Sequence, residues 1–106
     1  MPNDNYTVEI YPLAEDDLDS IYKYYFKESC EKSIAIKIVD KLKEAILRLS
    51  YMPKSHPFAR EKRLKKDGFR KLICGDYIIL FLVDDNKMIV SVVRIFHGKM
   101  NYQKYV

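Results

Sequence analysis

The spacing of apolar residues divides the chain into a strand, two helices and three further strands. Residues 6–11 (YTVEIY) alternate between apolar and polar side chains and are rich in β-forming residues, which predicts a first strand. A first helix is predicted next, because the proline and three acidic residues within positions 12–17 suit the start of a helix. Its apolar face consists of Leu18, Ile21, Tyr22 and Tyr25.

A second helix is predicted after a break near residues 28–30. Its apolar stripe runs for four turns without glycine or proline and consists of Ala35, Ile38, Val39, Leu42, Ile46 and Leu49. Pro53 and Pro57 end this helix and open a loop, because proline lacks an amide hydrogen and restricts the residue before it. Two helices joined by so short a break form an antiparallel hairpin.

Three strand-like runs follow, over residues 69–74, 77–83 and 88–97, and tight turns join them into a meander. The order of elements is therefore β-α-α-β-β-β. We predict an α+β fold in which a helical hairpin packs on a small, largely antiparallel, four-stranded curved sheet. At 106 residues, the chain has the size of a single domain, which we assign to residues 1–106.

The last strands are apolar on both faces. Tyr77, Ile79, Phe81 and Val83 alternate with Ile78, Leu80 and Leu82. Two helices can cover only one face of a four-stranded sheet, so the other face should curl on itself or be covered by a partner. Of these two alternatives, we favour a partner segment.

Positive charge is concentrated between the second helix and the meander. The net charge of the chain is +4 at pH 7, but residues 54–71 alone carry +6, which leaves −2 for the rest. The cations are Lys54, Arg60, Lys62, Arg63, Lys65, Lys66, Arg70 and Lys71, against Glu61 and Asp67. Such a patch favours a polyanionic partner, although a solvated loop has the same composition.

Several classes of protein are disfavoured by composition. Cys30 and Cys74 lie far apart and outside any zinc-binding spacing, so neither a disulfide framework nor a metal site is expected. With three glycines in all, a phosphate-binding glycine loop is disfavoured, and we expect no cofactor. The sequence shows neither a signal peptide nor a membrane span, so we expect a soluble, cytoplasmic protein.

His97 is the main candidate for acid–base chemistry, because it ends the last strand beside Gly98 and histidine titrates near neutral pH. A histidine at a strand end is nevertheless more often structural. Alternation along a strand puts Arg70 and Lys71 on opposite faces, so only one of them can share the face of His97. Arg94, three residues before His97, should face away from it.

Cleavage of RNA through its own 2′-hydroxyl group needs a base, an acid and cations that stabilise the phosphorane. His97 with either Arg70 or Lys71 would supply part of this set. Groups from the basic loop, such as Glu61, and Tyr102 as a stacking ring or proton donor would complete it.

These features form part of a longer pattern. It begins with Y-x-V-x-I-x-P-x-A-E-x-D-L-x-x-I-Y-x-Y at residues 6–24 and continues with LSYMP at 49–53 and RL at 63–64. It then includes GFRKL at 68–72, GDY at 75–77, VRIFHGK at 93–99 and Tyr102. In this ordered set, the chain resembles toxins of the RelE/ParE superfamily from bacterial type II toxin–antitoxin systems over nearly its whole length.

The resemblance implies one of two activities. RelE-like toxins cleave mRNA on the ribosome, whereas ParE-like toxins poison DNA gyrase and are not known to act as nucleases. It also implies a cognate antitoxin whose C-terminal segment wraps the toxin, and such a segment would cover the apolar sheet face. A homodimer and a toxin–antitoxin hetero-oligomer both remain open.

Our leading hypothesis from sequence is a ribosome-dependent mRNA endonuclease. By resemblance to relatives that use Glu, Arg and His, His97 would be the general acid or base and Glu61 would assist the base. Arg70 or Lys71 would stabilise the phosphorane. RNA would be bound by Arg60, Lys62, Arg63, Lys65, Lys66 and Lys99. The alternatives are a gyrase inhibitor that acts by binding alone and a degenerate toxin kept for antitoxin binding or repression.

Overall fold

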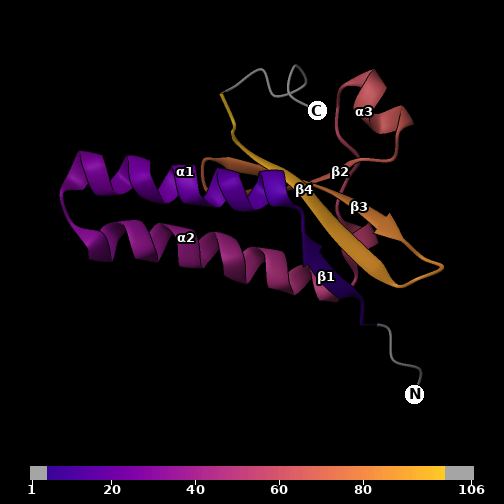
Figure 1. Cartoon of the computed structure of the whole chain (residues 1–106). Coiled ribbons are helices and arrows are strands. Elements are labelled where there is room, and N and C mark those ends of the chain that lie inside the picture. Colours follow the sequence, from indigo (N-terminus) through magenta and orange to yellow (C-terminus); the bar gives the residue numbers. More distant parts are fainter. Residues whose placement is uncertain (1–4, 100–106) are drawn as a thin grey trace.

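The computed structural model describes residues 5–99 and shows three helices and two short turns around one sheet (Figure 1). The chain runs through β1 (Thr7–Ile10), α1 (Pro12–Ser29), α2 (Lys32–Leu47) and two 3-10 turns, η1 (Arg48–Ser50) and η2 (Pro53–Ser55). It continues through α3 (Lys62–Lys66), β2 (Arg70–Cys74), β3 (Tyr77–Asp84) and β4 (Ile89–His97). The sheet order is β1-β4-β3-β2, with β1 parallel to β4 and the other pairs antiparallel. The predicted α+β fold is confirmed.

α1 and α2 form the predicted hairpin, which lies along one side of the sheet (Figure 1). α1 ends at Cys30, which has a left-handed backbone with φ of 55° and donates its N–H to the carbonyl of Phe26. The predicted break near residues 28–30 is therefore confirmed. The main core joins the two helices to the sheet through Ala14, Leu18, Ile21, Val39, Leu42, Ile46, Ile79, Phe81, Val90 and Val92.

A bulge in β4 sets which of its residues face the helices. Leu80 pairs with Arg94, but the next residue of β3, Phe81, pairs with Val92. Val93 is therefore an extra residue in β4, and the bulge lets both Val92 and Ile95 join the core on the helix side. Arg94 and Phe96 point to the opposite face of the sheet.

The segment between α2 and β2 covers the second face of the sheet. Leu64 of α3 and Ala59 pack with Leu80 and Phe96, and all four are at most 3% exposed. The N–H of Phe69 donates to the carbonyl of Leu64 at 2.9 Å, which closes the loop over this small second core. The expectation that a partner segment covers this face is wrong, because the chain's own basic loop covers it.

None of the helices within residues 5–99 combines the length and the apolar composition that a membrane span requires. Cys30 and Cys74 do not form a disulfide. The sulfur of Cys74 lies 3.9 Å from the carbonyl oxygen of Lys41, where the end of β2 meets α2.

Candidate functional site

The far end of β4 has a helix, rather than a strand, along one edge. β1 ends at Ile10, which pairs with Val92, and the next N–H, that of Tyr11, donates to the carbonyl of Val92 at 2.9 Å. Beyond this point α1 runs beside β4. The N–H of Ile95 donates to Oδ2 of Asp17 at 2.8 Å, so a helix carboxylate takes the place of a strand carbonyl.

The same carboxylate holds the guanidinium of Arg94. Nε of Arg94 lies 2.9 Å from Oδ2 of Asp17, and Nη2 lies 3.1 Å from Oδ1, which is a bidentate pair. The side chains are only 17% and 15% exposed, and the hydrogen bond to Asp17 raises the pKa of Arg94. Since Arg94 also lies over the ring of Phe96, at 4.7 Å, its charge is both fixed and neutralised.

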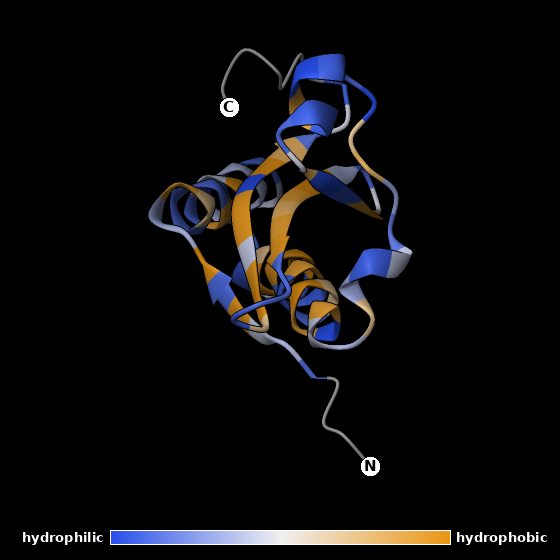
Figure 2. Ribbon diagram, turned by 90° about the vertical axis from the view of Figure 1, so that its right-hand side faces the viewer, coloured by the Kyte–Doolittle hydropathy of each residue, from blue (hydrophilic) through white to orange (hydrophobic). Residues whose placement is uncertain are grey.

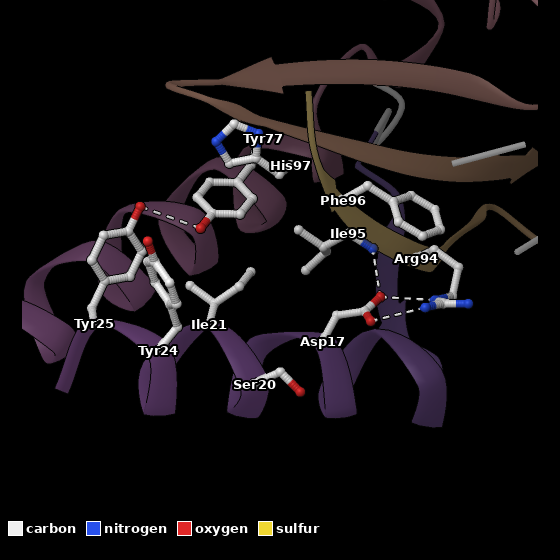
Figure 3. A pocket seen from close by; sticks show the side chains of 10 residues that line it. All are labelled: Asp17, Ser20, Ile21, Tyr24, Tyr25, Tyr77, Arg94, Ile95, Phe96 and His97. Carbon is white, nitrogen blue, oxygen red and sulfur yellow. Dashed lines mark hydrogen bonds and ion pairs between the residues drawn. The ribbon is translucent and has the colours of Figure 1, made fainter. Parts of the chain in front are cut away.

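A pocket of about 520 Å³ opens between α1 and the end of β4 (Figure 3). It is lined by Asp17, Ser20, Ile21, Tyr24, Tyr25, Tyr77, Arg94, Ile95, Phe96 and His97. Alternation does put Arg94 and His97 on opposite faces, as the sequence predicts, because they pair with Leu80 and Tyr77. Both nevertheless line one pocket, because the pocket lies at the edge of the sheet, where the long Arg94 side chain reaches α1.

His97 packs against an aromatic neighbour inside this pocket. Its ring lies edge-on to Tyr77, with centroids 5.4 Å apart (Figure 3). Nδ1 of His97 accepts the N–H of Lys99 at 3.2 Å, which requires an imidazole whose Nδ1 carries no proton.

Tyrosine hydroxyl groups make up most of the remaining polarity. The hydroxyl of Tyr77 donates to that of Tyr25 at 3.3 Å, and Tyr24 lies edge-on to Tyr25 with ring centroids 5.0 Å apart. Burial, followed by the bond to Tyr25, raises the pKa of Tyr77. Tyr77 therefore keeps its proton at neutral pH and is a hydrogen-bond donor rather than a base.

Arg70 lies at the other end of the sheet from His97. The residue of β2 in line with Tyr77 and His97 is Cys74, whereas Arg70 is in line with Phe81 and Val92. Four residues along a strand correspond to about 13 Å. The Nη1 of Arg70 donates to the carbonyls of His56 at 2.7 Å and Lys54 at 3.2 Å, and its guanidinium lies 3.9 Å from the ring centre of Phe58.

Lys71 and Glu61, two further residues proposed to be catalytic, do not line the pocket that contains His97. Lys71 pairs with Leu80 and faces the second core, on the side of the sheet opposite to His97, and its N–H donates to the carbonyl of Pro57 at 3.0 Å. Glu61 begins α3, where its carbonyl accepts the N–H of Lys65 at 2.9 Å. Tyr102 lies outside the described residues.

The proposed nucleic-acid-binding residues form two groups. Arg60, Lys62, Arg63, Lys65 and Lys66 are exposed on and beside α3, and Lys99 is exposed in the turn after β4. Among residues 5–99, no cluster of three or more His, Cys, Asp or Glu side chains is arranged to hold a metal ion.

Sequence reasoning missed the pair formed by Asp17 and Arg94. A signal for it exists: Asp17 stands three residues after Ala14 and four before Ile21, so a carboxylate occupies the buried stripe of α1. Arg94 likewise interrupts an apolar strand. Two opposite charges inside apolar patterns are a reason to expect that they bind each other.

Comparison with known proteins agrees with this architecture. Residues 8–102 match the family model described as the ParE toxin of the type II toxin–antitoxin system, parDE. No curated protein is significantly similar to the chain.

Two solved structures resemble the chain in fold. The chromosomal ParDE toxin–antitoxin system from P. aeruginosa superimposes with a TM-score of 0.74 at 20% identity, over 89% of this chain and 97% of that one. The toxin–antitoxin complex RelBE2 from Mycobacterium tuberculosis gives a TM-score of 0.61 at 23% identity, over 88% and 98%. Because the family model spans nearly the whole domain, the chain belongs to the ParE toxin family of type II toxin–antitoxin systems.

Proposed function

We propose that this toxin acts by binding rather than by cleaving RNA, and that its target is DNA gyrase, as the resemblance to ParE-like toxins implies. The observation that carries the proposal is the register of the sheet. Arg70 is about 13 Å along the strand direction from the row that contains His97, and Lys71 is on the opposite face.

The described part of the pocket is poorly equipped for phosphodiester cleavage. Such cleavage needs a cation that stabilises the charged phosphorane, together with separate acid and base groups. Arg94 is the cation among the lining residues, and Asp17 already neutralises it. The raised pKa of Tyr77 makes it a weak acid, and its hydroxyl already donates to Tyr25, so it is a poor partner for His97 in acid–base chemistry.

A ribosome-dependent mRNA endonuclease is the second candidate. This ranking is the reverse of the one that the sequence alone favoured. The observation in its favour is the set of exposed cations on α3, which suits RNA as well as DNA. In this case His97 would be the acid or base, and its substitution would abolish cleavage.

A cognate antitoxin is the expected partner under either activity, because both structural neighbours are toxin–antitoxin systems. The chain itself covers both faces of its sheet, so we infer that an antitoxin binds exposed helical and edge surfaces. The exposed Tyr24, which lines the pocket, and the exposed Phe26, which stacks on Tyr22 on another side of α1, provide two such surfaces.

Two assays with the purified toxin distinguish the candidates. The first follows supercoiling of relaxed plasmid by gyrase and looks for DNA cleaved in a gyrase complex. The second adds the toxin to programmed ribosomes and maps mRNA ends. We expect gyrase inhibition and intact mRNA. Ribosome-dependent cuts with normal gyrase activity, lost in His97→Ala, would instead establish the endonuclease, and no effect in either assay would indicate a degenerate toxin.

A further inference from the structure

α3 is a short basic helix that one apolar side chain anchors to the sheet. Leu64 is 1% exposed and packs with Leu80 and Phe96, while the other four residues of α3 are exposed. The helix is closed at its end by the N–H of Gly68, which donates to the carbonyl of Lys65 at 3.0 Å. The charged residues are thus presented from a fixed position on the sheet rather than from a loose loop.

The exposed residues of α3 are all cations, and they spread over its outer surface. At 100° per residue, Lys62 and Lys66 both point away from the sheet, on the side of the helix opposite to Leu64, and lie about 6 Å apart along the axis. Arg63 and Lys65 lie on the two flanks of the helix. Figure 2 shows α3 as a hydrophilic helix at the top of the molecule.

This arrangement opposes folding. Lys62 and Lys66 are four residues apart on one helix, where like charges repel each other. Within residues 5–99, Arg60, Lys62, Lys65 and Lys66 form no ion pair, whereas Lys54 is paired with Asp85 and Arg94 with Asp17. A bound polyanion would relieve this repulsion. The unfavourable clustering of like charges is therefore better explained by binding of a polyanion than by a solvated loop without a function.

α3 packs on one face of the sheet, whereas the pocket opens at the edge of the sheet, beside α1. Phe96 contributes to both, because it packs with Leu64 of α3 and also lines the pocket, but none of the residues of α3 lines the pocket. Binding of a polyanion to α3 would therefore leave the pocket and α1 accessible to a protein.

We propose that α3, with Arg60 beside it, binds the phosphate backbone of duplex DNA, and this inference rests on the proposed action at gyrase. In that setting, the duplex is the DNA that gyrase holds while the toxin contacts the enzyme. The lysine side chains of α3 neutralise phosphate charge without reading sequence. Proteins that hold single strands add aromatic rings for base stacking, and α3 has none.

The first test measures binding of the toxin to a fluorescent duplex of arbitrary sequence as salt rises from 50 to 200 mM. Each phosphate contact makes affinity fall about 3.5-fold over this range, so four contacts, one each from Arg60, Lys62, Lys65 and Lys66, predict a fall of about 150-fold. The affinity of the variant K62Q/K65Q/K66Q for the duplex should fall only about 3.5-fold over the same range, because one contact remains. K32Q/K37Q/K43Q, which removes three exposed lysines from α2, is the matched control and should behave like the original chain.

Equal salt dependence of the two triple variants would overturn the proposal. So would binding of duplex RNA, but not of duplex DNA, through the α3 lysines, because the surface would then serve RNA. Circular dichroism and urea unfolding verify that both variants fold. Removal of like charges should leave the unfolding midpoint of the α3 variant unchanged or slightly raised.

The second test separates this inference from the proposed function. If the α3 variant inhibits gyrase as strongly as the original toxin at every salt concentration, the DNA surface is refuted and the gyrase activity stands. If the original toxin leaves gyrase unaffected yet binds duplex DNA through α3, the proposed target is wrong and the surface stands. The expected result is gyrase inhibition that weakens at least tenfold in the α3 variant and not in the α2 control.

Discussion

The pair of Asp17 and Arg94 should be the most costly polar contact to break. Asp17→Ala removes both hydrogen bonds to Arg94 and the acceptor of the Ile95 N–H. It leaves a guanidinium that is only 17% exposed without its carboxylate. Lost hydrogen bonds to charged groups and an unpaired, partly buried charge lead us to expect a loss of about 3 kcal/mol in the free energy of unfolding.

A double-mutant cycle tests whether the two charges depend on each other. Arg94→Met should cost less, about 2 kcal/mol, because Asp17 still accepts the Ile95 N–H. The double variant should cost about 3 kcal/mol rather than the 5 kcal/mol of an additive pair, since neither charge is left without a partner. The expected coupling energy is therefore about 2 kcal/mol.

Urea unfolding at neutral pH, followed by circular dichroism, provides these free energies for the toxin freed of any antitoxin. The control is Asp19→Ala, which breaks the exposed ion pair with Lys23 and should leave the free energy of unfolding nearly unchanged. Two results would contradict this reasoning: additive losses in the free energy of unfolding for the Asp17 and Arg94 variants, or a loss for Asp17→Ala no larger than that of the control. Either would mean that Asp17 does not stabilise the edge of the sheet through Arg94 and Ile95.

Two further predictions follow from the same structure. Because burial raises the pKa of Tyr77 above its ordinary value of 10.0, only the unfolded chain loses this proton just above pH 10. Stability should fall there by up to about 1 kcal/mol per pH unit, and urea unfolding of Tyr77→Phe should show a shallower fall; equal slopes would contradict this. Arg70→Lys should lower stability by about 1–2 kcal/mol, because lysine cannot reproduce the bonds to the carbonyls of His56 and Lys54. Unchanged thermal unfolding with a loss of toxicity would instead restore a catalytic role for Arg70.

The main elements of the fold were predictable because their signals are local. The stripe from Ala35 to Leu49 predicts α2 with η1, and Gly75 with Asp76 predicts the turn between β2 and β3. Strand alternation also correctly put Arg94 and His97 on opposite faces. Each of these inferences needs only neighbouring residues.

The missed features depend on contacts between distant segments. α3 has one apolar residue among four cations, so no periodicity reveals it, and only its packing on Leu80 and Phe96 accounts for it. The same contact explains why no partner is needed on that face. Arg70 looked available for chemistry because its two carbonyl acceptors, 14 and 16 residues away, become neighbours only in the folded chain.

The parallel pairing of β1 with β4 has a consequence for the synthesis of the protein. Thr7 pairs with Ile89, so the first strand made must wait for the last before the sheet is complete. Pairing over so long a separation carries a high entropic cost of loop closure and slows folding. A nascent toxin can form its helical hairpin early, but it acquires the edge between α1 and β4, and with it the pocket, only after β4 has been translated. The order of its strands therefore couples formation of the pocket to completion of the sheet.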